Sequence, residues 1–164
     1  MGLFSLLLPN KGKKILAIGR LVNVLNDQVE GLKKLNVTSD KLYSQHILMF
    51  LYGFIIAFCK DYRIGVEGQK SRSDAIKDEG FYQVRYSTKD EGFYQVTLSV
   101  FMELFGDEKG SKMIVCLKGH LKRHNESQFS KMDYIVEGIR AGELHIKENM
   151  TGLVKEFLIG ANVE

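Results

Sequence analysis

Three residues with metal-binding side chains stand four positions apart in the C-terminal half of the chain: Cys116, His120 and His124. Steps of four place them on one face of an α-helix, with a drift of about 40° per step. A thiolate and two imidazoles form a ligand set that suits zinc or another borderline transition metal. Because these three residues span about 12 Å of helix, they cannot all reach one tetrahedral ion. A neighbouring pair such as His120 and His124 would need acidic ligands from elsewhere, for example Glu103 or Asp133.

The same stretch concentrates positive charge, at Lys109, Lys112, Lys118, Lys122 and Arg123. A cation-rich helix can bind phosphate groups through the release of counterions. The candidate residues for binding nucleic acid or another anionic surface are therefore Lys112, Lys118, Lys122 and Arg123. Aromatic residues that would stack on bases are missing from this stretch. Nearby acids, including Asp107 and Glu108, also allow a simpler interpretation as a solvated helix face, and nucleic acid is not the expected partner.

The elements that would position these residues are predicted to be helices. Residues Lys14–Leu35 have apolar side chains at steps of three and four, which is the pattern of an amphipathic helix: Ile15, Ile18, Val22, Leu25, Val29 and Leu32. Residues Ser39–Tyr62 are apolar almost all round, which is typical of a helix at the centre of a core. Thr38 or Ser39 can cap its first turn. The two helices, joined by a short turn, predict an αα-hairpin.

An eight-residue sequence, KDEGFYQV, occurs twice, at Lys77–Val84 and Lys89–Val96. Such identity indicates a tandem duplication covering residues 77–96, and the sequence does not show whether it is natural or engineered. On strands both copies would keep the same face, so residues 81–100 could form a β-hairpin with KDEG as its turn. Alternation fails at Val100–Met102, where three apolar residues follow one another. A helix over Phe93–Phe105 is therefore favoured, with the first copy as an inserted stretch.

Turn and capping residues divide the remainder of the chain. The glycine-bracketed stretch 105–112 (FGDEKGSK) is predicted to be a turn. Residues 112–124 are predicted to be helical, although the β-branched residues in MIVCL also allow a strand. Two further helices are expected, one from Ser130 to a stop at Gly142 and one from Thr151 to a stop at Gly160.

Length and composition bound the fold class. The 164 residues, 45% hydrophobic and 26% charged, fit one globular domain spanning 1–164. The prediction is a mostly all-α helical bundle built on the N-terminal hairpin, and the alternative is an α+β fold with a β-hairpin at residues 81–100. Residues 1–12 form a short apolar and basic segment. The longest apolar run, 47–58, is too short to span a bilayer, although residues 2–14 could touch a membrane surface.

Function is constrained mainly by missing motifs. The chain has no nucleophile elbow, phosphate-binding loop or dinucleotide fingerprint. We therefore expect a non-enzymatic helical interaction or regulatory protein that self-associates or binds a protein partner. The alternatives are a metal-binding bundle using His120, His124 and Cys116, and a weak binder of nucleic acid or anionic surfaces. No cofactor is expected apart from the transition metal of the first alternative. Two cysteines, Cys59 and Cys116, are expected to be reduced thiols, which favours the cytoplasm.

Overall fold

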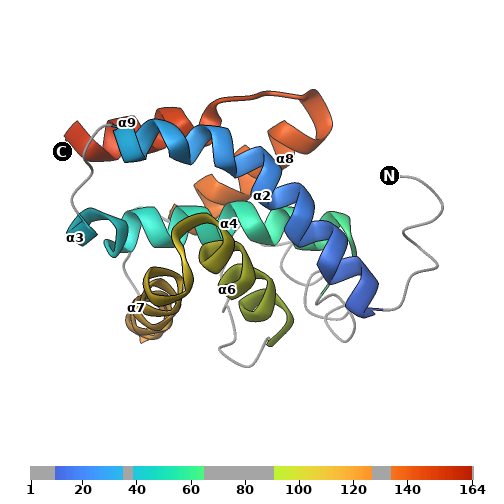
Figure 1. Cartoon of the computed structure of the whole chain (residues 1–164), viewed down its shortest axis with the longest axis horizontal. Coiled ribbons are helices and arrows are strands. Elements are labelled where there is room, and N and C mark those ends of the chain that lie inside the picture. The colour runs from blue at the N-terminus through green and yellow to red at the C-terminus, as the bar shows by residue number, and fades with distance from the viewer. Residues whose placement is uncertain (1–9, 35–38, 65–90, 127–133, 164) are drawn as a thin grey trace.

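The computed structural model describes residues 10–34, 39–64, 91–126 and 134–163, and in these ranges it contains helices and no strand (Figure 1). The elements are α2 (Asn10–Lys34), α3 (Ser39–Leu42), α4 (Gln45–Asp61), α6 (Glu91–Phe105), α7 (Asp107–Glu126), α8 (Tyr134–Glu148) and α9 (Leu153–Val163). The prediction of an all-α helical bundle is therefore confirmed. The N-terminal segment 1–9 lies outside the described residues.

Helix α4 is the centre of the bundle. Every residue from Ile47 to Cys59 is buried, because α2, α6, α7, α8 and α9 all contact it. Figure 1 shows α4 crossing the middle of the molecule, with α6 and α7 on one side and α8 on the other. A helix that is apolar all round needs such enclosure, so the expected core position of this segment is confirmed.

The prediction of one continuous helix over Ser39–Tyr62 is wrong at one point, because the chain turns at Tyr43 and Ser44. The backbone of Ser44 is extended, with φ −68° and ψ 148°. Its amide and its hydroxyl both donate to the carbonyl oxygen of Lys41, at 3.1 and 2.6 Å. The hydroxyl closes α3 and makes no capping hydrogen bond to α4. This break leaves the backbone carbonyl of Tyr43 facing α7, where His120 contacts it.

Close packing between α4 and α8 depends on glycine. These two helices make the most extensive contact in the described part of the chain. A Cβ built at Gly142 would lie 2.6 Å from the Cβ of Ala57. Helix α8 continues past Gly142 to Glu148, so the prediction that it stops at Gly142 is wrong. Glycine at position 142 lets the two helices approach closely. From a single sequence this role cannot be distinguished from that of a glycine that ends a helix.

Residues 91–105 form α6, which confirms the helix predicted over Phe93–Phe105. The second strand of the alternative hairpin at residues 81–100 is excluded, because Val96 and Val100 are buried on a helix. The first copy of the duplication, Lys77–Val84, lies outside the described residues. The duplication therefore stays a sequence interpretation.

The turn expected at residues 105–112 is much shorter than predicted, since only Gly106 separates α6 from α7. Its φ of 90° is in the region that glycine adopts most easily. Gly110 then lies inside α7, and a Cβ there would stand 2.6 Å from the backbone nitrogen of Met102. The two glycines thus make a tight corner, and α7 is helical rather than a strand.

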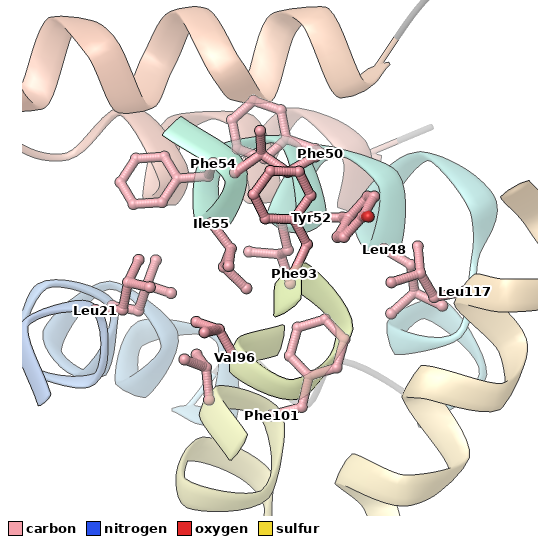
Figure 2. Close-up of a cluster of buried hydrophobic side chains, with 14 of the residues drawn as sticks. Leu21, Leu48, Phe50, Tyr52, Phe54, Ile55, Phe93, Val96, Phe101 and Leu117 are labelled. Atoms are coloured by element: carbon pink, nitrogen blue, oxygen red, sulfur yellow. The ribbon is translucent and has the colours of Figure 1, made fainter. Parts of the chain in front are cut away.

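Helix α2 packs mainly on α6 and α9, with a smaller contact on α4. The predicted hairpin partners do meet, but neither is the other's principal neighbour. The buried stripe of α2 runs through Ala17, Leu21, Leu25 and Val29. Ile15, which the sequence pattern assigned to the apolar stripe, is 61% exposed. Figure 2 shows Leu21 of α2 facing the core, where side chains of α4, α6 and α7 meet.

The first turn of helix α9 is capped by a side chain from another helix. It starts at Leu153 after Gly152, whose φ is +85°, so the predicted cap at Thr151 is wrong. The amides of Val154 and Lys155 donate to Oε1 of buried Gln28, at 3.1 and 3.2 Å. The expected stop at Gly160 is also wrong, because the helix continues past it.

Candidate interaction surfaces

The predicted metal ligands lie on α7, and the ring of His120 makes two hydrogen bonds. The Nε2 atom of His120 lies 2.9 Å from the carbonyl oxygen of Tyr43. Because a carbonyl oxygen only accepts, Nε2 carries the proton in this contact. The other ring nitrogen, Nδ1, accepts from a guanidinium nitrogen of Arg123 at 2.7 Å. A metal ion could bind His120 only by displacing Tyr43 or Arg123.

The rest of the predicted metal set does not assemble in the part of the chain that the structure describes. No group of three or more His, Cys, Asp or Glu side chains there could hold a metal ion. Cys116 is half-buried against the core, and Glu103 is exposed on α6. The side chains of His124 and Asp133 lie outside the described residues. A metal site using His120, His124 and Cys116 therefore stays a prediction.

The predicted anion-binding residues also lie on α7, and the structure holds three of them in defined positions. The Nζ of Lys112 lies 4.5 Å from the ring centre of Tyr43, and the Nζ of Lys118 lies 5.4 Å from that of Tyr94. Arg123 is fixed by its contact with His120. Lys122 is exposed. These cations share α7 with Val115, whose side chain is 67% exposed.

A second surface lies on α2. At about 100° per residue, six positions between residues 12 and 26 fall within one arc of the helix that points away from its buried stripe. We call this the α2 outer face: Gly12, Ile15, Leu16, Gly19, Asn23 and Asn26. These six residues carry no charge, and Glu30 follows on the same arc one turn beyond Asn26. The side chains of Ile15 and Leu16 are 61% and 46% exposed. A Cβ built at Gly19 would meet no atom within 4 Å.

Two cations of α2 make contacts away from the α2 outer face. Lys14 donates from Nζ to Oε1 of Gln95 on α6, at 2.6 Å. Arg20 forms an ion pair with Asp61 at 3.3 Å, and its guanidinium carbon lies 5.1 Å from the ring centre of Phe58. These contacts draw positive charge from α2 toward α6 and the C-terminal turn of α4. The outer face is left uncharged.

The sequence pattern missed the α2 outer face because it assigned Ile15 to the buried stripe. A helical projection centred on Leu21 and Leu25 would have placed Ile15 on the outside. It would also have shown that Gly12 and Gly19 lie one above the other there. The sequence pattern also did not identify Val115 and Tyr43 as parts of the surface on α7. The contact of Tyr43 depends on the break between α3 and α4, which no periodicity predicts.

Comparison of the chain with protein-family models, with curated proteins and with solved structures finds no match. Among the described helices, none has the length and apolar character that crossing a bilayer requires. A proposal about function therefore depends on the two surfaces, on α2 and on α7.

Proposed function

We propose that this protein is a non-enzymatic helical interaction protein that self-associates through the α2 outer face. The observation that carries the proposal is the adjacent exposure of Ile15 and Leu16 among the six uncharged residues of this face. Single exposed aliphatic residues are common on protein surfaces. Two neighbours beside a glycine with open space above it are better suited to packing against another helix.

A second copy of the chain is the partner that fits this face. In a twofold arrangement the two α2 helices run antiparallel and cross at Gly19, so each copy presents the same residues to the other. Ile15 of one copy then lies opposite Asn23 of the other. Because Gly19 has no side chain, the two backbones can approach closely there. Ile15 and Leu16 pack on either side of the crossing and leave water.

Charge also favours a second copy. The chain carries a net charge of +3, so two copies repel each other unless the contact lies where charge is low. The six residues of the α2 outer face meet this condition, because Lys14 and Arg20 are engaged elsewhere, with α6 and α4. One helix face is smaller than a standard interface of about 800 Å² per partner. The dimer is therefore weak and reversible, as suits a regulatory subunit or adaptor.

The proposal includes a cytoplasmic location. Cys59 and Cys116 are thiols, which is the state expected in a reducing compartment. Cys59 is fully buried in the core, whereas Cys116 is half-buried. Oxidation of these residues has no part in the proposed association, which uses neither of them.

Sedimentation velocity over a concentration series tests this function. The unmodified protein is expected to shift from monomer toward dimer as its concentration rises. The variant Ile15→Glu should remain monomeric, because a carboxylate opposite Asn23 of the other copy would be buried without an opposite charge. Ile159→Glu, on α9, is the matched control, since Ile159 is also an exposed isoleucine, at 41%. A strict monomer at every concentration would contradict the proposal, as would equal dimerisation of both variants.

A further inference from the structure

Positive charge is uninterrupted by acidic residues over most of α7. From Lys109 to Asn125 the chain has five lysine and arginine residues and no acid. The chain as a whole has a net charge of only +3, so the remainder is net negative. None of Lys112, Lys118, Lys122 and Arg123 forms an ion pair with a carboxylate in the described part of the molecule. Their charge is therefore directed to solvent or to a partner.

These cations lie along two flanks of the solvent-facing side of α7. At about 100° per residue, Lys112 and Arg123 share one flank, while Lys118 and Lys122 share the other. Val115 lies between the flanks. Each flank rests on an aromatic residue, because Lys112 lies over Tyr43 and Lys118 over Tyr94. On the first flank, the guanidinium of Arg123 folds toward Gly119. Its nearest nitrogen lies 3.7 Å from the position that a Cβ of residue 119 would occupy.

Val115 gives this basic face an apolar centre. Its side chain is 67% exposed, more than any other large hydrophobic residue in the described ranges. Helices that lie on a membrane surface combine Lys and Arg side chains with apolar side chains that enter the headgroup boundary. The apolar group enters the boundary between headgroups and acyl chains, while the lysine side chains extend to the phosphates.

We propose that the solvent-facing side of α7 binds the surface of a bilayer that contains anionic phospholipid. Charge complementarity selects such a surface, and the exposed Val115 favours a bilayer over a polynucleotide. Phosphate backbones offer no apolar region for Val115. The tyrosine rings beside the cations are covered by Lys112 and Lys118, so they are not presented for stacking on bases. The binding is peripheral, and it uses a surface separate from the α2 outer face.

Co-sedimentation with vesicles tests this inference on the full chain. One set of vesicles contains phosphatidylcholine alone, and the other contains phosphatidylcholine with phosphatidylserine. We expect binding to the second set only, and it should weaken as salt is raised. Lys118→Gln and Lys122→Gln should each lower the affinity about fivefold, since each cation near an anionic surface contributes on that scale. Lys147→Gln, an exposed lysine on α8, is the charge control.

Substitution of Val115 distinguishes binding to a bilayer from binding to a polynucleotide. Val115→Ser should weaken vesicle binding and Val115→Phe should strengthen it, whereas Ile159→Ser on α9 should change nothing. Circular dichroism confirms that each variant is folded. The inference is overturned if the protein does not bind phosphatidylserine vesicles at low salt. It is also overturned if the protein binds duplex RNA more tightly than vesicles and Val115→Ser leaves vesicle binding unchanged.

Discussion

Gly138 of α8 lies directly against the backbone of Phe50 of α4, so close that a Cβ at position 138 would overlap the carbonyl oxygen of Phe50. Gly53 of α4 has the same relation to the carbonyl oxygen of Ile135. Each helix therefore contributes a glycine where the backbone of the other passes. This reciprocal contact fixes α8 against α4 and encloses one side of the most apolar segment of the chain.

Replacing Gly138 by alanine tests the importance of this contact. The added methyl group cannot be accommodated unless the two helix backbones separate, so we expect a loss of about 3 kcal/mol or more in the free energy of unfolding. Urea denaturation measures the change. Gly160→Ala is the matched control, because a Cβ there meets nothing within 4 Å. Equal stability of the two variants would show that α4 and α8 are not packed this closely.

The cap that Gln28 provides for α9 predicts a local effect. Gln28→Met keeps the length of the side chain but removes the oxygen that accepts from Val154 and Lys155. Two amides lose their partner, so we expect about 1–3 kcal/mol of destabilisation. Hydrogen exchange should accelerate first at those two amides. Gln45→Met, at an exposed glutamine, should have little effect, and unchanged exchange in α9 would exclude the cap.

The ion pair between Arg20 and Asp61 is partly exposed, with 38% and 26% of the two side chains accessible. A double-mutant cycle with Arg20→Gln and Asp61→Asn should give a coupling energy of only about 0.2–1 kcal/mol, which falls as salt is raised. Arg20→Gln should cost more than Asp61→Asn, because it also loses the contact with the Phe58 ring. A coupling energy independent of salt would indicate that the pair is shielded from solvent.

Much of the fold follows from the sequence, because the strongest local signals agree with the packing. Residues 45–61 are apolar all round and could be stable only at the centre of a bundle. The failure of strand alternation at Val100–Met102 predicted α6 despite the duplication. Local signals failed where a tertiary contact changed the role of a residue. Gly142 resembled a helix stop, but it is the point where α8 meets Ala57.

The candidate surfaces were predicted less completely. Composition alone identified Lys112, Lys118, Lys122 and Arg123 as a basic cluster, since the charge of α7 is visible in the sequence. The contacts that orient Lys112 and Lys118 come from Tyr43 and Tyr94, which are distant in sequence. Such contacts depend on how helices are arranged, and periodicity within one helix does not contain that information.

The proposed dimer is tested most directly by filling the space above Gly19. Gly19→Gln should be accommodated in a single copy, and the better helix propensity should stabilise it by about 0.5 kcal/mol. Gly160→Gln should also be accommodated. Sedimentation velocity should then show a dimer about tenfold weaker or more for Gly19→Gln, and an unchanged dimer for Gly160→Gln. If Gly19→Gln dimerises as tightly as the unmodified protein, the α2 outer face is not where two copies meet.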